Sequence, residues 1–197
     1  MPKSKSVFIC QNCGAESSKW IGRCPSCKEW NTYHEELVVP ASSYNSSILS
    51  DKVKRNPELL DNISSDEKNR IRTGISEVDR ILGGGMVAGS LILLGGEPGI
   101  GKSTLALQLA LALNNSKILY VSGEESEEQI SLRAKRLKGR NPNCYILNET
   151  DLENILTHSD NLKPDLIIID SIQTINSRLL ESSSGSVSQV RECAAQL

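Results

Sequence analysis

Short apolar runs alternate with amphipathic stretches from residue 72 onward. Four of these runs are rich in aliphatic and β-branched residues and have the length of buried strands: residues 90–95, 117–122, 143–147 and 165–170. Between them, apolar residues recur with the spacing of helices. Strands that alternate with helices are typical of βαβ units, so this part of the chain is predicted to be an α/β parallel sheet with flanking helices.

The same pattern predicts four helices. Residues 103–113 are apolar on most faces, which indicates a buried helix. Ser126 with Gln129 has the spacing of a capping box, Asp151 can cap a third helix, and Ser186 with Gln189 opens a fourth. The last helical pattern runs to the end of the sequence, and no strand pattern follows it. The sheet is therefore predicted to be incomplete.

A separate unit, dense in cysteine and aromatic residues, is predicted over residues 7–36. Its four cysteines have the spacing C-x2-C-x10-C-x2-C and are Cys10, Cys13, Cys24 and Cys27. Two such pairs can place four thiolates tetrahedrally around Zn²⁺ and leave no position for water or substrate, so the predicted role of the metal is structural. A redox dithiol is the less favoured alternative.

His34, the two tryptophans and the two other cysteines are not expected to bind the metal. His34 could replace a ligand, but four thiolates suffice, so His34 is predicted to lie on the surface. Trp20 and Trp30 are expected to cover the small core rather than to stack on nucleic-acid bases. Cys144 and Cys193 lie far from the cluster and are predicted to be buried small residues.

The chain is expected to divide into three segments. Residues 41–66 contain seven serines and no sustained apolar period, which is typical of a tether. We therefore expect a zinc finger over residues 1–37, a flexible linker over 38–68 and a P-loop core over 69–197.

The chemistry of the core is predicted from the sequence GEPGIGKS, which fits the motif G-x4-G-K-[ST]. It follows the apolar run 90–95 and opens the helix 103–113, the context in which backbone N–H groups wrap a polyphosphate. Lys102 is expected to reach the β- and γ-phosphates, and the Ser103 hydroxyl to bind Mg²⁺. A nucleoside triphosphate, ATP or GTP, is expected to bind Gly96, Glu97, Pro98, Gly99, Ile100, Gly101, Lys102, Ser103 and Thr104.

Acidic residues follow two of the predicted strands. Asp170 ends the run 165–170, where a carboxylate points into the ligand crevice of a parallel sheet, and is expected to hold Mg²⁺ or its water; the alternative is a loop cap. Glu124 and Glu125 follow the run 117–122. One of them is expected to act as the general base that polarises the attacking water, although acids there also stabilise a helix N-terminus.

The overall charge narrows the function classes. With 22 basic and 24 acidic residues the net charge is −2, so any contact with nucleic acid must be local. The basic cluster between residues 133 and 140 is expected to form a solvated face, with a nucleic-acid or subunit contact as the alternative. Its members are Arg133, Lys135, Arg136, Lys138 and Arg140.

No apolar run approaches the ~20 residues of a membrane-spanning helix, and the first ten residues lack the apolar core of a secretory signal. We therefore expect a cytoplasmic protein with no membrane partner. In that reducing compartment six cysteines indicate metal binding or chemistry rather than disulfides.

In combination, these motifs resemble the N-terminal portion of the RadA (Sms) family of bacterial DNA repair proteins, which are RecA-like ATPases. The resemblance rests on CPSC and EWNT in the finger, then RIRTGISEVDRILGGG, GGEPGIGKSTLALQ, VSGEES, IIIDSIQTI and GSVSQVRE. It implies a DNA-dependent ATPase of recombinational repair that processes branched intermediates. It also implies single-stranded or branched DNA as partner, a hexameric ring, and ATP, Mg²⁺ and Zn²⁺ as cofactors.

The resemblance also implies roles for single residues. Gly96 to Thr104 would be the Walker A loop, with Lys102 as its catalytic lysine, and Asp170 would be the Walker B acid. Glu124, by its place in VSGEES, would be the catalytic glutamate rather than Glu125. Residues 172–186 would match the first DNA-contacting loop. A small-molecule kinase would use the same P-loop, but the zinc finger argues against it.

Members of that family continue well past residue 197. In RecA-like sheets the strand after the Walker B helix inserts between the Walker A and Walker B strands. We therefore expect a gap in the sheet beneath the nucleotide site. The alternative to an active ATPase is a non-catalytic fragment that binds nucleotide or DNA.

Overall fold

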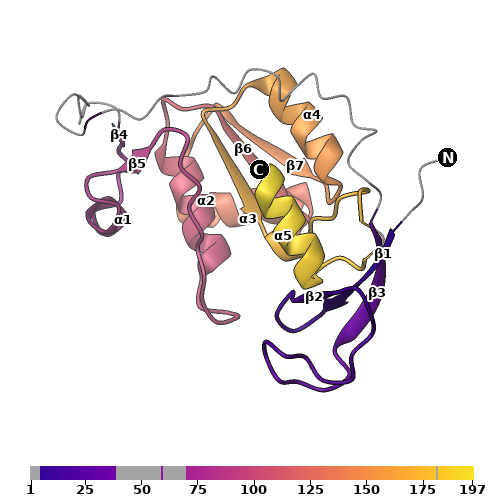
Figure 1. The fold of residues 1–197 in the computed structure, drawn as a ribbon. Helices are drawn as coiled ribbons and strands as arrows, with labels where there is room; N and C mark the ends of the chain where they lie inside the picture. The colour runs from indigo at the N-terminus through magenta and orange to yellow at the C-terminus, as the bar shows by residue number, and fades with distance from the viewer. Residues whose placement is uncertain (1–4, 39–58, 60–69, 181) are drawn as a thin grey trace.

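Three parallel strands form the centre of the larger part of the molecule (Figure 1). The central strand is β6 (Ile118–Ser122), which pairs with β7 (Cys144–Asn148) on one side and with β8 (Leu166–Asp170) on the other. Every residue of β6 is buried, which explains why its sequence is apolar except for the Tyr120 hydroxyl and the last residue, Ser122. The computed structural model describes residues 5–38, 59, 70–180 and 182–197, so most of the linker expected over 38–68 lies outside the described residues.

Four helices cover the two faces of this sheet: α2 (Lys102–Ala112), α3 (Glu127–Leu137), α4 (Leu152–Leu162) and α5 (Val187–Gln196). Alternate side chains of β6 enter different cores because successive residues of a strand point to opposite faces. Ile118 and Tyr120 pack with α2 and α3, whereas Leu119 and Val121 pack with α4 and α5. The predicted α/β class and parallel sheet are confirmed.

The predicted helix starts are present. At the start of α3, the Ser126 hydroxyl accepts a hydrogen bond from the backbone N–H of Gln129. The side-chain oxygen of Gln129 accepts one from the backbone N–H of Ser126, which completes a capping box. Asp151 caps α4 and Ser186 caps α5 through their side-chain oxygens. Within the described part of the chain, none of the helices is long and apolar enough to cross a membrane.

The strand predicted over residues 90–95 is wrong. These residues adopt no regular secondary structure, and Leu91 and Leu93 are 75% and 85% exposed. The run has the composition of a buried strand, but a strand forms only where a neighbour accepts and donates its backbone hydrogen bonds. Among the described strands none pairs with this segment, and β8 pairs only with β6. β8 is therefore an edge strand of the sheet that the structure describes.

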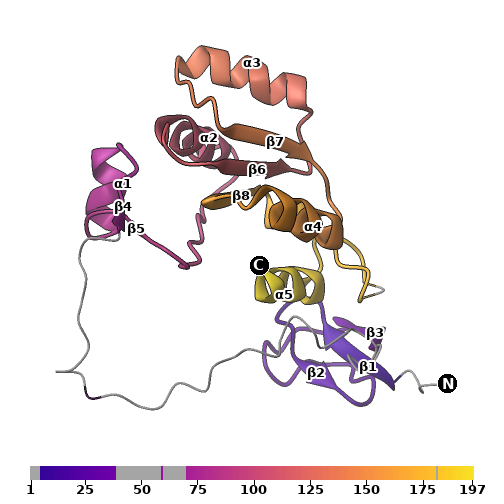
Figure 2. The same cartoon turned by 90° about the horizontal axis from the view of Figure 1, so that it is seen from above.

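A small unit precedes the exposed run 90–95 and lies on the opposite side of the molecule from the N-terminal cysteine unit (Figures 1 and 2). It consists of β4 (Arg70–Ile71), α1 (Ser76–Ile81) and β5 (Met86–Val87), with β4 and β5 antiparallel. Asp79 accepts two 2.8 Å hydrogen bonds from the backbone N–H and hydroxyl of Thr73, and these bonds lower the pKa of its carboxyl group. They tie α1 to the short segment that follows β4.

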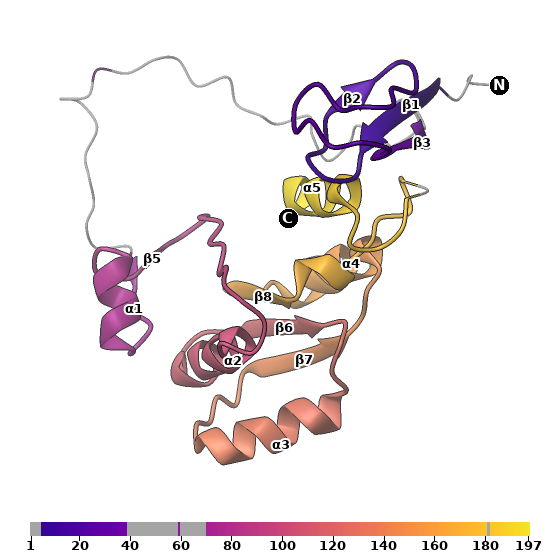
Figure 3. The same ribbon diagram turned by 90° about the horizontal axis from the view of Figure 1, so that it is seen from below.

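The N-terminal cysteine unit is an antiparallel ribbon of three strands. Its order is β2 (Glu16–Ser17), β1 (Lys5–Cys10) and β3 (Tyr33–Val38). Figures 2 and 3 both show it packed on α5, which lies between the ribbon and the rest of the α/β part. The ribbon core consists of Cys10, Cys24 and Tyr33 together with neighbouring Phe8, Ala15 and Cys27.

Candidate functional sites: a cysteine cluster and a phosphate loop

Two backbone turns of the same geometry present the four cysteines. In the first, Cys10 accepts from the N–H of Gly14 (2.8 Å) and donates to Ala15. In the second, Cys24 accepts from the N–H of Lys28 (2.9 Å) and donates to Glu29. Gly14 and Lys28 occupy equivalent places and both have positive φ, 72° and 65°, so each CxxC pair ends in the left-handed residue that this turn requires.

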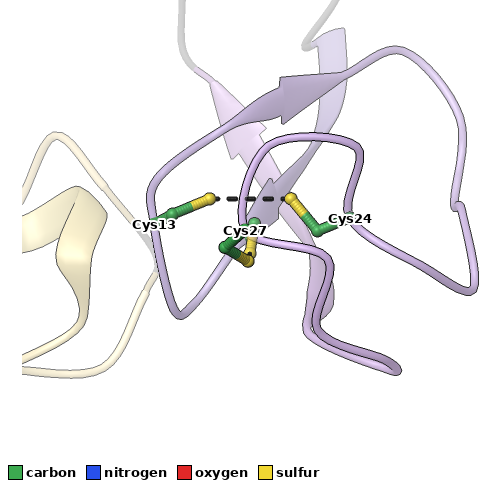
Figure 4. A group of neighbouring side chains, drawn as sticks. Cys13, Cys24 and Cys27 are labelled. Carbon is green, nitrogen blue, oxygen red and sulfur yellow. Dashed lines mark hydrogen bonds between the residues drawn. The ribbon is translucent and has the colours of Figure 1, made fainter.

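The four sulfur atoms converge at one point. All lie within 4.8 Å of one another, with 3.6 Å between Cys10 and Cys27 and 3.5 Å between Cys13 and Cys24. Figure 4 shows the thiols of Cys13, Cys24 and Cys27 directed toward one another. Tetrahedral coordination with bonds of about 2.3 Å requires sulfur separations of about 3.8 Å, so the cluster fits Zn²⁺ with little rearrangement.

Local hydrogen bonds favour the thiolate form of Cys24, which is the form that binds a metal. The backbone N–H of Cys27 and the Tyr33 hydroxyl lower the pKa of the Cys24 thiol to about 6, against the opposing effect of burial. The Tyr33 hydroxyl lies 3.6 Å from the Cys24 sulfur. His34 is exposed on β3, as predicted, and is not among the groups of the described cluster.

The first cysteine turn also contacts the α/β part. Arg191 on α5 donates from Nη1 to the carbonyl oxygen of Gly14 at 3.1 Å and lies 3.9 Å from a carboxylate oxygen of Glu16. A Cβ placed on Gly14 would lie 2.9 Å from Val187, also on α5. Gly14 therefore allows both the tight turn and the close approach of the helix.

The phosphate-loop motif lies between the exposed run and α2. Gly99 and Gly101 adopt positive φ, 79° and 103°, and α2 begins at Lys102. The Lys102 ammonium group donates to the carbonyl oxygens of Gly96 and Glu97, both at 2.8 Å, and thus lies across its own loop. The loop residues 96–101 are exposed and open to a ligand.

Asp170 joins the loop to the sheet. Its Oδ1 accepts from the Ser103 hydroxyl at 2.8 Å and its Oδ2 accepts from the Tyr120 hydroxyl at 2.7 Å. Burial, together with the hydrogen bond to Asp170, raises the pKa of Tyr120, so its hydroxyl remains a donor at neutral pH. Hydroxyl and carboxylate oxygens are ligands that Mg²⁺ prefers, so the Ser103–Asp170 pair fits that ion. The sequence analysis overlooked Tyr120, whose hydroxyl is the only polar group in the strand sequence ILYV.

The two candidate glutamates have different partners. Glu125 forms an ion pair with Arg133, a half-buried residue of α3, and its N–H donates to the Ser122 hydroxyl. Glu124 is exposed, and its carboxylate accepts from the hydroxyl of Ser171, the residue after Asp170, at 2.9 Å. A Cβ at Gly123, just before the pair, would overlap Thr174, so this glycine lets the loop reach the residues after β8.

Arg133 corrects the prediction that the basic cluster is a solvated face. Lys135, Arg136, Lys138 and Arg140 are exposed as expected. Arg133 instead points inward, and its Nη1 is buried without a hydrogen-bond partner in the described structure. Its position three residues after the buried Ile130 is the signal that could have identified it.

Residues 172–180 and 182–186 follow β8 as the 3-10 turn η4 (Ile172–Thr174) and loop segments. Gln189 of α5 lies 1% exposed and fixes this loop by accepting from the N–H of Ser177 and donating to the carbonyls of Ser177, Leu180 and Ser182. The Arg178 guanidinium group pairs with Asp151 but stays 65% exposed. Gln189 was expected only as part of a cap, which misses its main contacts.

The prediction that Trp20 and Trp30 cover the ribbon core is wrong. Their exposed fractions are 54% and 66%. The buried cluster of the ribbon consists of cysteines and Tyr33 packed with Phe8 and Ala15, and neither indole belongs to it. Cys193 is buried as predicted, and Cys144 is half-buried.

Comparison with known proteins assigns both parts of the chain. The family model described as an AAA domain matches residues 55–197, and one described as a rubredoxin metal binding domain matches residues 8–35. The chain therefore belongs to the AAA domain family and has a metal-binding ribbon at its N-terminus. The second match agrees with the cysteine cluster and supports zinc there.

Individual relatives share a single name. The chain is 47% identical to "DNA repair protein RadA" of Bacillus subtilis, with 100% of this chain and 44% of the relative covered. The proteins of the same name from Listeria monocytogenes and Streptococcus pyogenes are 47% and 48% identical, over 99% and 100% of this chain and 43% and 44% of their own lengths. The resemblance to the RadA family is confirmed, and the chain spans less than half the length of these relatives.

Proposed function

We propose that this chain is part of a DNA-dependent ATPase that acts in recombinational DNA repair and processes branched recombination intermediates. One observation carries the proposal. The Ser103 hydroxyl donates to Asp170 across 67 sequence positions, which joins the phosphate loop to the tip of a parallel strand. The name of the relatives supports the repair role. The segments 1–37, 38–68 and 69–197 are proposed as zinc finger, linker and ATPase core.

The phosphate loop is proposed to hold ATP. Residues Gly96 to Thr104 would surround the phosphates with backbone N–H groups, and the Lys102 ammonium would exchange its two loop carbonyls for phosphate oxygens. Ser103 and Asp170 would hold Mg²⁺, which neutralises phosphate charge when it is bound. Tyr120 would fix the orientation of Asp170 by occupying its second oxygen.

Glu124 is the proposed general base. The Glu125 carboxylate is already committed to an ion pair with Arg133 on α3. Among the residues that the structure describes, the recorded partner of the Glu124 carboxylate is the hydroxyl of Ser171, the residue that follows Asp170. Its partner geometry therefore supports the same residue that the family resemblance implies.

The proposed partners follow from the loop and the relatives. Residues 172–186 would contact single-stranded or branched DNA, with the exposed Arg178 as their one basic side chain. The proposed assembly is a hexameric ring, and the proposed compartment is the cytoplasm. A second function, non-catalytic binding of nucleotide or DNA, is favoured by the exposure of Leu91 and Leu93 beside the phosphate loop.

A matched pair of variants tests the proposal. Glu124→Gln should retain ATP binding but slow hydrolysis by about 10²–10⁴-fold, because it removes the proposed general base. Glu125→Gln should retain most turnover, because Glu125 is paired with Arg133 and is not the proposed base. Steady-state phosphate release and ATP binding are measured for both variants. A larger loss in Glu125→Gln would overturn the assignment. Bound ATP with no turnover by the unsubstituted chain would favour the binding function.

A further inference from the structure

Residues 19–30, which contain the second cysteine turn and which we call the tryptophan turn, present an exposed aromatic surface. Trp20 and Trp30 are the only two tryptophans of the chain, and more than half of each side chain is accessible. Ile21 between them is 39% exposed. The ribbon uses its other turn, around Gly14, to contact α5. The tryptophan turn is therefore available to a ligand while the ribbon stays docked.

The two indoles are held close together. An added Cβ on Gly22 would lie 3.6 Å from the Trp20 ring and 3.9 Å from the Trp30 ring, so both ring edges border the same glycine. The Arg23 guanidinium carbon lies 5.6 Å from the centre of the Trp30 ring, and its Nε donates to the carbonyl of Lys28 at 3.0 Å. Arg23 and Trp30 also face each other in an antiparallel bridge. The Arg23 contacts position the Trp30 ring before any ligand binds, and the Trp20 ring borders the same glycine.

The charge around the rings is positive, although that of the whole chain is not. Lys19, Arg23 and Lys28 are exposed on this turn, and Glu29 is the one acidic residue among positions 18–31. The whole chain, in contrast, carries a net charge of −2. Exposed aromatic rings beside local positive charge match a ligand with flat faces and a polyanionic backbone, which are the properties of a single-stranded nucleic acid.

We propose that the tryptophan turn binds single-stranded nucleic acid. Bases would stack on Trp20 and Trp30, and phosphates would lie near Lys19, Arg23 and Lys28. This inference goes beyond the proposed ATPase site, since it gives DNA a contact on the ribbon that requires no nucleotide. It also assigns the ribbon a role besides structural metal binding.

Tryptophan fluorescence tests this contact directly, because both fluorophores lie on the proposed surface. The zinc-loaded chain is titrated with oligo(dT) in low salt without ATP, and separately with an abasic oligomer of the same length. Stacking predicts strong quenching by oligo(dT) and little by the abasic oligomer. Equal quenching by both would overturn the stacking proposal, as would binding of labelled oligo(dT) with no quenching.

Variants at Trp30 distinguish the effect of the aromatic ring on binding from an effect on folding of the ribbon. Trp30→Ala should weaken oligo(dT) binding, measured by anisotropy of labelled DNA, by about 5- to 150-fold, whereas Trp30→Phe should retain most of the affinity. One zinc per chain in each variant confirms that the ribbon is folded. Unchanged affinity in zinc-loaded Trp30→Ala would overturn the proposal. Lys102→Ala should leave the quenching intact, so failure of the ATPase proposal is distinguishable from failure of this one.

Discussion

The hydrogen bond between Tyr120 and Asp170 gives a prediction that can be worked from the structure. Tyr120 is fully buried, and its hydroxyl donates to a carboxylate oxygen at 2.7 Å. A hydrogen bond to a charged group contributes about 1.5–3 kcal/mol. Tyr120→Phe removes this bond and keeps the ring in the core, so the free energy of unfolding should fall by that amount.

For a chain of this size, such a loss lowers the melting temperature by about 3–12 °C. The matched control is Tyr145→Phe on the neighbouring strand, where Tyr145 is 46% exposed and pairs in register with Leu119. That change should stay within about 0.5 kcal/mol. Thermal unfolding is followed by circular dichroism at 222 nm, because tryptophan fluorescence reports only the ribbon.

The two variants also probe the orientation of Asp170. Because Tyr120 occupies one oxygen of this carboxylate, its loss should reduce the stabilisation that Mg²⁺ and ATP give to the chain. Equal melting temperatures for Tyr120→Phe and Tyr145→Phe would show that the hydroxyl contributes nothing. The reasoning about the site would then be refuted.

Three further predictions concern the ribbon and the core. Chelation of zinc, whose binding supplies about 10–16 kcal/mol in zinc-finger peptides, should unfold residues 5–38. The helical signal at 222 nm should remain, because the two large buried clusters belong to the α/β part; loss of that signal would show that the core needs the ribbon to stay folded. Gly14→Ala should separate the ribbon from α5, because the added Cβ would lie 2.9 Å from Val187 and the φ of +72° disfavours alanine. We expect faster amide hydrogen exchange in α5; unchanged exchange would contradict this prediction. Ile155→Ala removes a fully buried side chain and should cost about 2–5 kcal/mol by urea unfolding, whereas the exposed Leu132→Ala should cost little, so similar values for both would contradict the packing.

The sequence predicted the elements whose signals are local. The runs that became β6, β7 and β8 carry their strand pattern in five or six residues, and Ser126 with Gln129 fixes a helix start within four. The cysteine spacing alone predicted the cluster, because two short turns suffice to converge four sulfur atoms. In these cases the determining contacts lie close together in the sequence.

Features that depend on distant contacts could not be predicted in this way. The run 90–95 has strand composition, but pairing requires a neighbouring strand whose position no local pattern encodes. Trp30 is exposed and lies outside the buried cluster of the ribbon, which composition does not reveal. The contact of Tyr120 with Asp170 spans 50 positions and depends on the register between β6 and β8.

The central claim, that the phosphate loop and Asp170 form a working ATPase site, is tested most directly by steady-state ATP hydrolysis of this chain with and without single-stranded DNA. Lys102→Ala serves as the blank, because it removes the ammonium group that spans the loop. The account predicts turnover that DNA stimulates and that Lys102→Ala abolishes. Turnover no greater than that of Lys102→Ala, with ATP still bound, would contradict it and leave a nucleotide-binding fragment.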